Sequence, residues 1–136
     1  PVLNPRYGIP DAPRLPFRPR SGLLEWPVST IPSPLGNLPF GGGVYFRFLP
    51  WALTAAACAR AAEAGEPLLF YLHPWEIDPH QPRYSSGSFF ADLRHYHRLE
   101  CTADKLDRLL SMQSSVPLIE TARKFFPDQG TEVLAC

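Results

Sequence analysis

The spacing of apolar residues in the first part of the chain predicts two strands on either side of one helix. Residues 23–31 combine β-branched and aromatic side chains after a Ser-Gly turn signal, which is typical of a strand. Residues 53–64 are rich in alanine, the strongest helix former, and Gly65 follows as a helix C-cap. Residues 68–73 form an apolar run of strand composition. This order predicts an α/β fold with a βαβ unit whose second strand is parallel and buried.

Beyond residue 79 the pattern changes to helical spacing. A first helix is expected over residues 89–99, where Phe89, Leu93 and Tyr96 share one face. A second helix is expected to begin at an N-cap threonine, Thr102, and a last short helix over residues 116–126. The apolar stripe of the second helix consists of Leu106, Leu109, Leu110 and Met112.

Prolines and glycines limit what the N-terminal part of the chain can form. The chain has 17 prolines, concentrated in residues 1–50, so this part is expected to be extended strands, turns and loops. Pro27 must place a bulge or an edge in the strand predicted around it. The glycines of residues 41–43 lack the pattern of a phosphate-binding loop. They fit a tight loop or a ligand-lining loop equally well.

Charge and cysteine content exclude several classes of protein. The 136 residues include 13 basic and 13 acidic side chains without a long Lys/Arg run, which argues against a nucleic-acid surface. No apolar run approaches the roughly 20 residues of a membrane span. Cys58, Cys101 and Cys136 have neither zinc-site nor disulfide-framework spacing. We therefore expect unpaired thiols in a reducing compartment and a cytoplasmic location.

One dense group of reactive side chains follows the second predicted strand. His73 is placed to exchange protons with a reacting atom, and Glu76 or Asp78 could orient its ring. Trp75 could form an apolar wall or stack on a sugar ring. A hydrogen-bonded core histidine followed by a polar loop explains the same residues equally well. The other pair of nearby histidines is spaced two residues apart rather than four, so we expect no metal site there.

Four ordered blocks of the sequence resemble one enzyme family. They read Arg6-Tyr-Gly-Ile-Pro-Asp-Ala-Pro-Arg14, Leu24-Glu-Trp-Pro-Val-Ser-Thr30, Asn37-Leu-Pro-Phe-Gly-Gly-Gly43 with Tyr45-Phe-Arg47, and Tyr71-Leu-His-Pro-Trp-Glu-Ile-Asp-Pro79. The chain resembles the C-terminal portion of bacterial polysaccharide deacetylases of the NodB-homology class, carbohydrate esterase family 4. The subgroup is the one associated with exopolysaccharide gene clusters, which bears a C-terminal DUF3473 region.

The resemblance implies a fold and a division of the chain. Residues 1–79 would be the C-terminal half of a distorted (β/α)7 barrel. Residues 80–136 would be a mainly helical extension, with the DUF3473-like region overlapping both parts. The family removes N-acetyl groups from sugar polymers with a divalent metal, commonly zinc, held by motifs of the TFDDG and HSxxH kinds. Neither motif occurs in this sequence, so no metal ligand is expected in this chain.

The resemblance also assigns roles to individual residues. His73 matches the histidine that acts as general acid toward the leaving amine. Glu25 matches the Leu-Glu-Trp-Pro strand motif. The substrate pocket is expected to include Glu25, Tyr45, Phe70, Trp75, Glu76 and Asp78.

The partners implied are a polysaccharide substrate and the missing N-terminal half of the barrel. The chain alone is expected to be inactive and able to self-associate through exposed sheet edges. The alternative is a non-catalytic module that binds a glycan or a protein through Trp75, Tyr45 and the arginines of residues 6–20.

Overall fold

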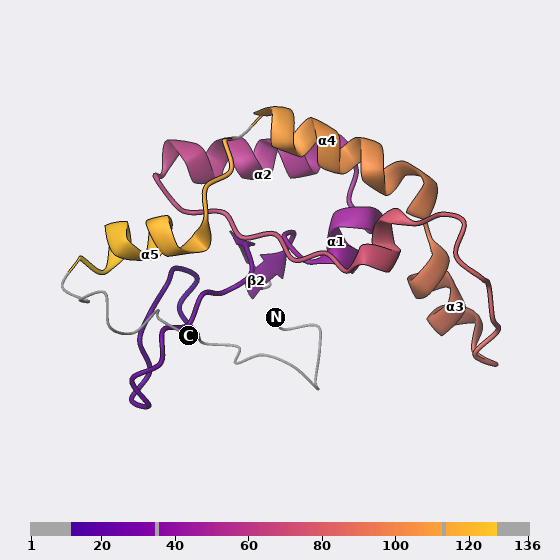
Figure 1. The fold of residues 1–136 in the computed structure, drawn as a ribbon, viewed down its shortest axis with the longest axis horizontal. Helices are drawn as coiled ribbons and strands as arrows, with labels where there is room; N and C mark the ends of the chain where they lie inside the picture. Colours follow the sequence, from indigo (N-terminus) through magenta and orange to yellow (C-terminus); the bar gives the residue numbers. More distant parts are fainter. Residues whose placement is uncertain (1–11, 35, 113, 128–136) are drawn as a thin grey trace.

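The computed structural model describes residues 12–34, 36–112 and 114–127. These residues form a short β-hairpin, five α-helices and two short 3-10 helices. The hairpin lies below α2 and α4, while α5 and α3 occupy opposite ends of the molecule (Figure 1). No helix in the described ranges is long and apolar enough to cross a bilayer. The hairpin and the helices together confirm a mixed α/β class for these residues.

The hairpin pairs β1 (Thr30–Ser33) with β2 (Gly36–Pro39) in antiparallel register, Thr30 opposite Pro39. The strand predicted over residues 23–31 is therefore wrong for most of its length. Pro27 supplies no N–H to a ladder, which is why regular pairing begins only after it. Upstream of it, Glu25 makes a single antiparallel bridge with Phe17.

Two helices follow the hairpin in quick succession. Helix α1 (Gly43–Phe48) begins inside the glycine run, and α2 (Trp51–Glu63) begins directly after Pro50. The predicted alanine-rich helix is confirmed as α2. Gly65 has a φ of +66° just beyond its end, a conformation that glycine adopts without steric cost.

The segment predicted as the second strand is extended but does not form a ladder. Its Leu69 exchanges hydrogen bonds with Ser29, whose N–H donates to Leu69 O at 3.1 Å and whose Oγ accepts from Leu69 N–H at 2.7 Å. Two residues on, Tyr71 N–H donates to Gly41 O at 2.8 Å and forms a single parallel bridge with Gly42. A parallel neighbour is thus present, but it is too short for a strand. The only sheet in the described ranges is the two-stranded hairpin, so the barrel remains an expectation.

The chain then winds through two 3-10 helices and three α-helices. They are η1 (Pro74–Ile77), α3 (Phe89–Tyr96), η2 (Leu99–Cys101), α4 (Thr102–Met112) and α5 (Leu118–Phe125). Thr102 is not an N-cap, because η2 runs directly into α4. Its Oγ1 instead donates to Arg98 O at 2.8 Å.

One hydrophobic core joins residues from both predicted regions of the chain. Leu109 of α4 is buried, whereas Leu110 and Met112 are exposed, so only part of the predicted stripe faces inward. The buried members of the core cluster are Phe40, Phe46, Ala57, Cys58 and Leu109. The residues after 79 therefore complete the core of the residues before it.

Helix α4 also caps α1. The ammonium group of Lys105 donates to the carbonyl oxygens of Phe46 and Leu49, the latter at 2.6 Å. The same ammonium lies 4.5 Å from the centroid of the Phe46 ring. Burial lowers the pKa of Lys105 to about 8, with Arg98 contributing in the same direction. This contact satisfies carbonyls that a short helix leaves unpaired at its C-terminus.

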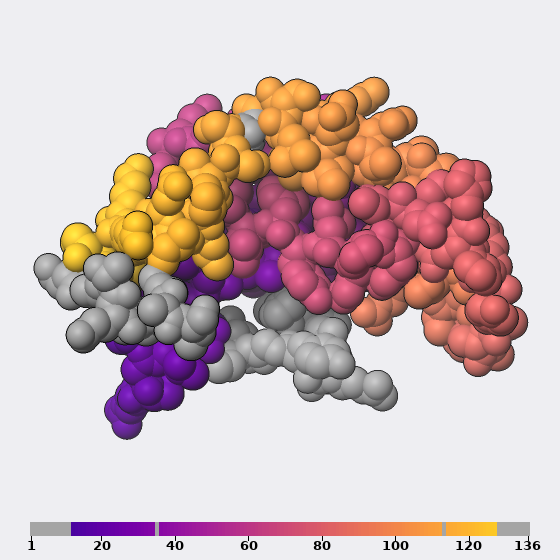
Figure 2. Space-filling view, viewed as in Figure 1, coloured from indigo at the N-terminus to yellow at the C-terminus, as the bar shows by residue number. Residues whose placement is uncertain are grey.

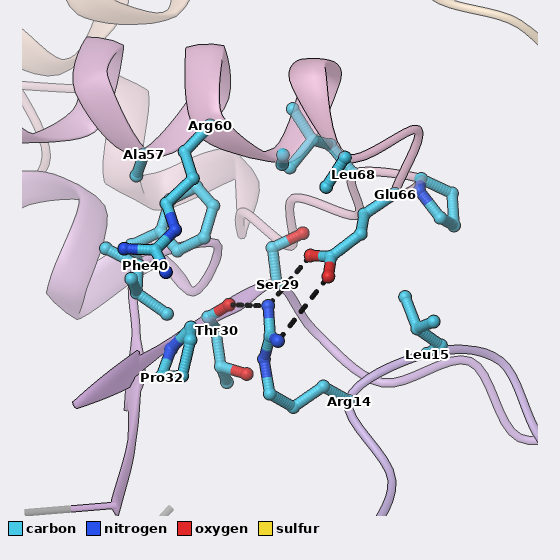
Figure 3. A pocket seen from close by; sticks show the side chains of 14 residues that line it. Arg14, Leu15, Ser29, Thr30, Pro32, Phe40, Ala57, Arg60, Glu66 and Leu68 are labelled. Atoms are coloured by element: carbon cyan, nitrogen blue, oxygen red, sulfur yellow. Dashed lines mark hydrogen bonds and ion pairs between the residues drawn. The ribbon is translucent and has the colours of Figure 1, made fainter. Parts of the chain in front are cut away.

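An ion pair connects the N-terminal loop to the segment that follows α2. Arg14 donates to Glu66 Oε2 at 2.8 Å and to Thr30 O at 3.0 Å, as Figure 3 shows. These residues line a cavity of about 150 Å³ between the hairpin and α2. Both charged side chains are about one quarter exposed, so the pair contributes at most about 1 kcal/mol.

Candidate functional site

The site is built where the extended segment 68–72 turns into η1. His73 occupies the N-cap position, and Pro74 fixes the first turn of the 3-10 helix. The carboxylate of Glu76 reaches back to this turn and accepts the His73 N–H at 2.9 Å. The backbone N–H of Glu76 in turn donates to His73 O at 3.0 Å. The short helix therefore places a carboxylate directly beside the histidine.

The imidazole of His73 is held at both ring nitrogens. Its Nδ1 lies 3.3 Å from Glu76 Oε2, and its Nε2 lies 3.0 Å from the hydroxyl of Tyr71. An ionised carboxylate can only accept, so the hydrogen-bond pattern assigns the proton of the neutral ring to Nδ1. The Nε2 atom then accepts from the Tyr71 hydroxyl. With the His73 side chain 47% exposed, Nε2 is the nitrogen left for exchange with a ligand.

Glu76 itself is buried against an arginine of α1. Its Oε1 accepts from Arg47 Nε at 3.2 Å, and the two side chains are 1% and 0% exposed. Burial lowers the pKa of Arg47, and the adjacent carboxylate opposes that shift. A buried carboxylate needs such a counter-charge to remain ionised. The ion pair therefore maintains the negative charge that faces His73.

The remaining donors of Arg47 bind the C-terminal end of α3. They donate to the carbonyl oxygens of His95 and His97 at 2.9 Å each and of Arg94 at 3.0 Å. These carbonyls have no partner within the helix, so the guanidinium replaces the missing backbone donors. One side chain thus connects the His73 turn to a helix twenty or so residues further along the chain.

Two glycines of the 41–43 run are required by close packing. A Cβ on Gly43 would lie 1.8 Å from Glu76 Oε2, and a Cβ on Gly41 would lie 2.4 Å from Leu69 O. Gly42 has no such contact, since its nearest neighbour would be Tyr45 Cδ2 at 3.5 Å. The glycine run therefore allows close packing at the site. It lets the carboxylate and the extended segment approach α1.

Aromatic rings cover one side of the site. Trp75 stacks on His95 of α3 at 4.2 Å between centroids, and the Arg47 guanidinium lies 5.1 Å from the centroid of the Trp75 ring. His73 stacks more distantly on Trp75, at 5.7 Å. The Nε2 atom of His95 lies 3.2 Å from Gln81 Oε1. Trp75 therefore packs within the protein and orients both histidines.

The structure brings together only part of the predicted set. His73, Trp75 and Glu76 form one cluster, whereas the Asp78 carboxylate turns away and accepts the His80 N–H at 3.0 Å. Phe70 packs edge-to-face on the core rings of Phe40 and Phe46. Glu25 is exposed on its bridge to Phe17, and Tyr45 packs beside Gly42. No hydrogen bond, ion pair or ring contact in the described residues joins Glu25, Tyr45 or Asp78 to His73.

Sequence reasoning missed three members of the cluster. Tyr71 could have been found, because residues two apart on an extended segment share a face. Arg47 stands alone as a charge within an apolar block, which is a weaker signal. For His95 the sequence offers only its two-residue spacing from His97, which argues against a metal site. Its stacking partner is twenty residues away, a separation that no local pattern marks.

The described residues do not fit a metal site. They contain no group of three or more His, Cys, Asp or Glu side chains that could hold an ion. The metal that the resemblance implies would have to be held by residues outside those described.

These features define a mixed α/β protein in which a buried ion pair supports a half-exposed histidine. The sequence profile of one protein family, described as domain of unknown function (DUF3473), matches residues 1–122. The chain belongs to this family. No curated protein and no solved structure matches the chain.

Proposed function

We propose that the chain is the C-terminal portion of a metal-dependent polysaccharide deacetylase, with His73 as the general acid. The observation that carries the proposal is the Glu76–His73 contact. A buried, ion-paired carboxylate fixes Nδ1 and leaves Nε2 at the surface. This is the orientation that a proton donor to a leaving group needs. Resemblance of the four sequence blocks to the NodB-homology class supports the same reaction.

The proposed step uses only one nitrogen of the His73 ring, Nε2. After water has added to the acetamide carbonyl, the Nε2–H of the protonated ring is transferred to the amide nitrogen as the C–N bond breaks, which releases acetate and leaves a free amine on the sugar. The carboxylate of Glu76 stabilises the positive charge that the ring carries before transfer. The Tyr71 hydroxyl must move off Nε2 as the substrate nitrogen approaches. Because the Tyr71 side chain is exposed and is not held by burial, moving its hydroxyl costs little free energy.

The remaining parts of the proposal lie outside the described residues. The barrel, the metal ligands and the catalytic base would come from other polypeptide, and the substrate would be an N-acetylated exopolysaccharide. The chain alone would then be inactive. It would supply the acid and one wall of the substrate site.

The test is acetate release from an N-acetylated polysaccharide by the complete polypeptide that carries this sequence, after titration with zinc. We expect His73→Ala to lower the rate by about 10²–10⁴-fold, the contribution typical of general acid catalysis. His80→Ala is the matched control, because His80 lies in the following turn without contacting the cluster. Unchanged activity of the His73→Ala protein would rule out the acid role.

A protein-interaction module is the second candidate, and it is favoured by an apolar groove of about 460 Å³ lined by Leu68, Phe70 and Leu72 together with residues of α4. In that case the His73 cluster would be structural. Loss of His73 would then change neither the release of acetate nor the binding of a partner. A glycan-binding role is less well supported, because the Trp75 ring already stacks on His95.

A further inference from the structure

A pocket of about 340 Å³ lies between the start of α2 and the first half of α4. Residues from 49–51, in the link from α1 to α2, form one wall, and residues from 98–108 form the other. Figure 2 shows α4 on the outer surface of the molecule, with no described segment in front of it. Arg47 also lines the pocket, but Glu76 already compensates its charge. Because His73 does not line it, the proposed reaction gives this pocket no role.

The other charged side chains along the pocket are mainly positive. Arg98, Lys105 and Arg108 line it together with one carboxylate, that of Asp104. No ion pair or side-chain hydrogen bond in the described residues involves Arg98 or Arg108. Three cations against one carboxylate leave an excess of two positive charges.

These positive charges lie close enough to repel one another. After burial, the nearby charge of Arg98 is the next cause that lowers the pKa of Lys105. The Lys105 ammonium donates to the carbonyl oxygens of Phe46 and Leu49, which are neutral acceptors and leave its charge uncompensated. Like charges held together in this way are stabilised by an anion that approaches all of them.

Two features of the backbone favour an anion at the same place. Arg98 has a φ of +57° and is the only residue other than glycine with a positive φ in the described ranges. This conformation is costly for a residue with a side chain, and such residues concentrate at functional sites. Helix α2 begins at the pocket with Pro50 as N-cap, and its first turn has neither a capping side chain nor an acidic residue. The positive end of its dipole is therefore uncompensated there.

We propose that this pocket binds the phosphate group of an organic phosphate monoester. A phosphate dianion matches the excess of two positive charges, whereas a carboxylate carries only one charge. The guanidinium groups of Arg98 and Arg108 are suited to paired hydrogen bonds with phosphate oxygens. Leu49, Pro50 and Trp51 supply an apolar wall for the sugar or nucleoside that carries the phosphate. This inference goes beyond the proposed function and does not depend on the chemistry at the candidate site.

The test is calorimetric titration of the complete polypeptide that carries this sequence, at constant ionic strength. The probes are glucose 6-phosphate, AMP, inorganic phosphate and glucose. We expect the phosphate esters to bind saturably, inorganic phosphate to bind more weakly because it lacks the ring, and glucose not to bind. The tighter ester shows whether the attached group is a sugar or a nucleoside. Inorganic phosphate that binds as tightly as both esters would overturn the assignment to an ester.

Three substitutions locate the binding in this pocket. Arg108→Gln should weaken binding of the tighter ester by at least about tenfold, because it removes a charge-assisted contact. Arg98→Asn should have a similar effect, and asparagine tolerates the positive φ at this position. Asp104→Asn should instead strengthen binding by roughly two- to fivefold, because it removes the one negative charge. A variant that fails to fold cannot bind more tightly, so this gain separates binding from stability.

The matched control is Arg123→Gln, at an exposed arginine of α5 that does not line the pocket. It should bind the ester as the parent does, and all variants should keep the circular dichroism spectrum of the parent. The proposal is overturned if neither ester binds, or if Arg98→Asn and Arg108→Gln both bind as tightly as the parent. Equal weakening by Arg123→Gln would also overturn it, in favour of a general effect of surface charge.

Discussion

The guanidinium of Arg47 and the carboxylate of Glu76 form an ion pair of 3.2 Å, with the side chains 0% and 1% exposed. The two residues come from separate blocks, one within α1 and one within η1. Through Glu76 the pair fixes His73, and through the other nitrogens of Arg47 it fixes the end of α3. Two blocks on which the family resemblance rests are therefore coupled physically.

Breaking this pair on one side should be costly. Glu76→Leu leaves a buried guanidinium without a counter-charge, and we expect a loss of about 3–5 kcal/mol in the free energy of unfolding. Because Arg47→Met also removes the donors to the α3 carbonyls, a double-mutant cycle isolates the pair. Glu76→Leu should cost less in the Arg47→Met background than in the parent, since no guanidinium is then left unpaired. Urea denaturation of the four proteins measures both losses, and equal losses in the two backgrounds would contradict the pairing.

The Arg14–Glu66 pair provides the control for that cycle. Its side chains are about one quarter exposed, so solvent screens the interaction. We expect Glu66→Leu to change the free energy of unfolding by no more than about 1 kcal/mol. An equal effect at the two pairs would show that burial is not what makes the Arg47–Glu76 pair important.

Gly43 and Gly42 should respond in opposite ways to alanine. A Cβ at Gly43 would lie 1.8 Å from Glu76 Oε2, so Gly43→Ala must push the carboxylate away from Arg47 and His73. Gly42 has a φ of −91° and only an ordinary contact at 3.5 Å, so alanine there should be neutral or stabilise by about 0.4–1 kcal/mol. Denaturation curves of the two variants test this. Equal tolerance at both positions would be inconsistent with the packing described.

The tautomer of His73 can be observed directly. The Glu76 contact places the proton of the neutral ring on Nδ1, with Nε2 accepting from Tyr71. In alkaline solution, ¹⁵N chemical shifts should therefore show a protonated Nδ1 and an unprotonated Nε2. Tyr71→Phe should retain this tautomer, because Glu76 alone determines it. A ring protonated at Nε2 would remove the structural basis for the proposed acid.

The helices show what a sequence of this kind predicts well. Helix α2 was predictable because alanine content and the glycine at its end are local signals. The segment 68–72 was recognised as extended, but its partners were not predictable. Ser29 and Gly41 lie far away in sequence, and one of the two contacts uses a side-chain hydroxyl in place of a backbone carbonyl.

In the candidate site, a contact within one turn was predictable from the sequence, and contacts between distant segments were not. His73 and Glu76 were found because they are three residues apart in one turn. Arg47 and Glu76 are 29 residues apart in two different short helices, and no periodicity relates side chains of separate elements. The glycine run left a tight loop and a ligand-lining loop equally open. Only the positions of Glu76 and Leu69 show that close packing requires Gly43 and Gly41.

The pKa of Lys105 predicts a pH dependence of stability. It is about 8 in the folded chain, against about 10.4 for an unfolded lysine. Between these values the unfolded chain binds more protons at this residue, so the free energy of unfolding should rise with pH there. We expect this rise in the parent and in Lys124→Met, the control at the other lysine, and its loss in Lys105→Met. Denaturation at pH 7.5, 9 and 10 measures the difference, and parallel curves for both variants would contradict the assignment.

Cys58 offers a probe of how the His73 site and the core are coupled. It is fully buried beneath α4, and burial raises the pKa of its thiol, whereas Cys101 is exposed. Because the thiolate is the reactive form, Cys58 should react with a thiol reagent only when the fold opens. The experiment uses a Cys101→Ser/Cys136→Ser background, so that Cys58 is the only thiol present.

In this background the labelling rate should report the stability of the whole core. If Glu76→Leu lowers the free energy of unfolding by about 3 kcal/mol, the open population rises by about a hundredfold, and labelling of Cys58 should accelerate by the same factor. Glu66→Leu should leave the rate within about fivefold of the parent, in proportion to its smaller effect. If Glu76→Leu lowered global stability without accelerating the labelling of Cys58, the ion pair would hold only the His73 turn, and the core around α2 would open independently of it.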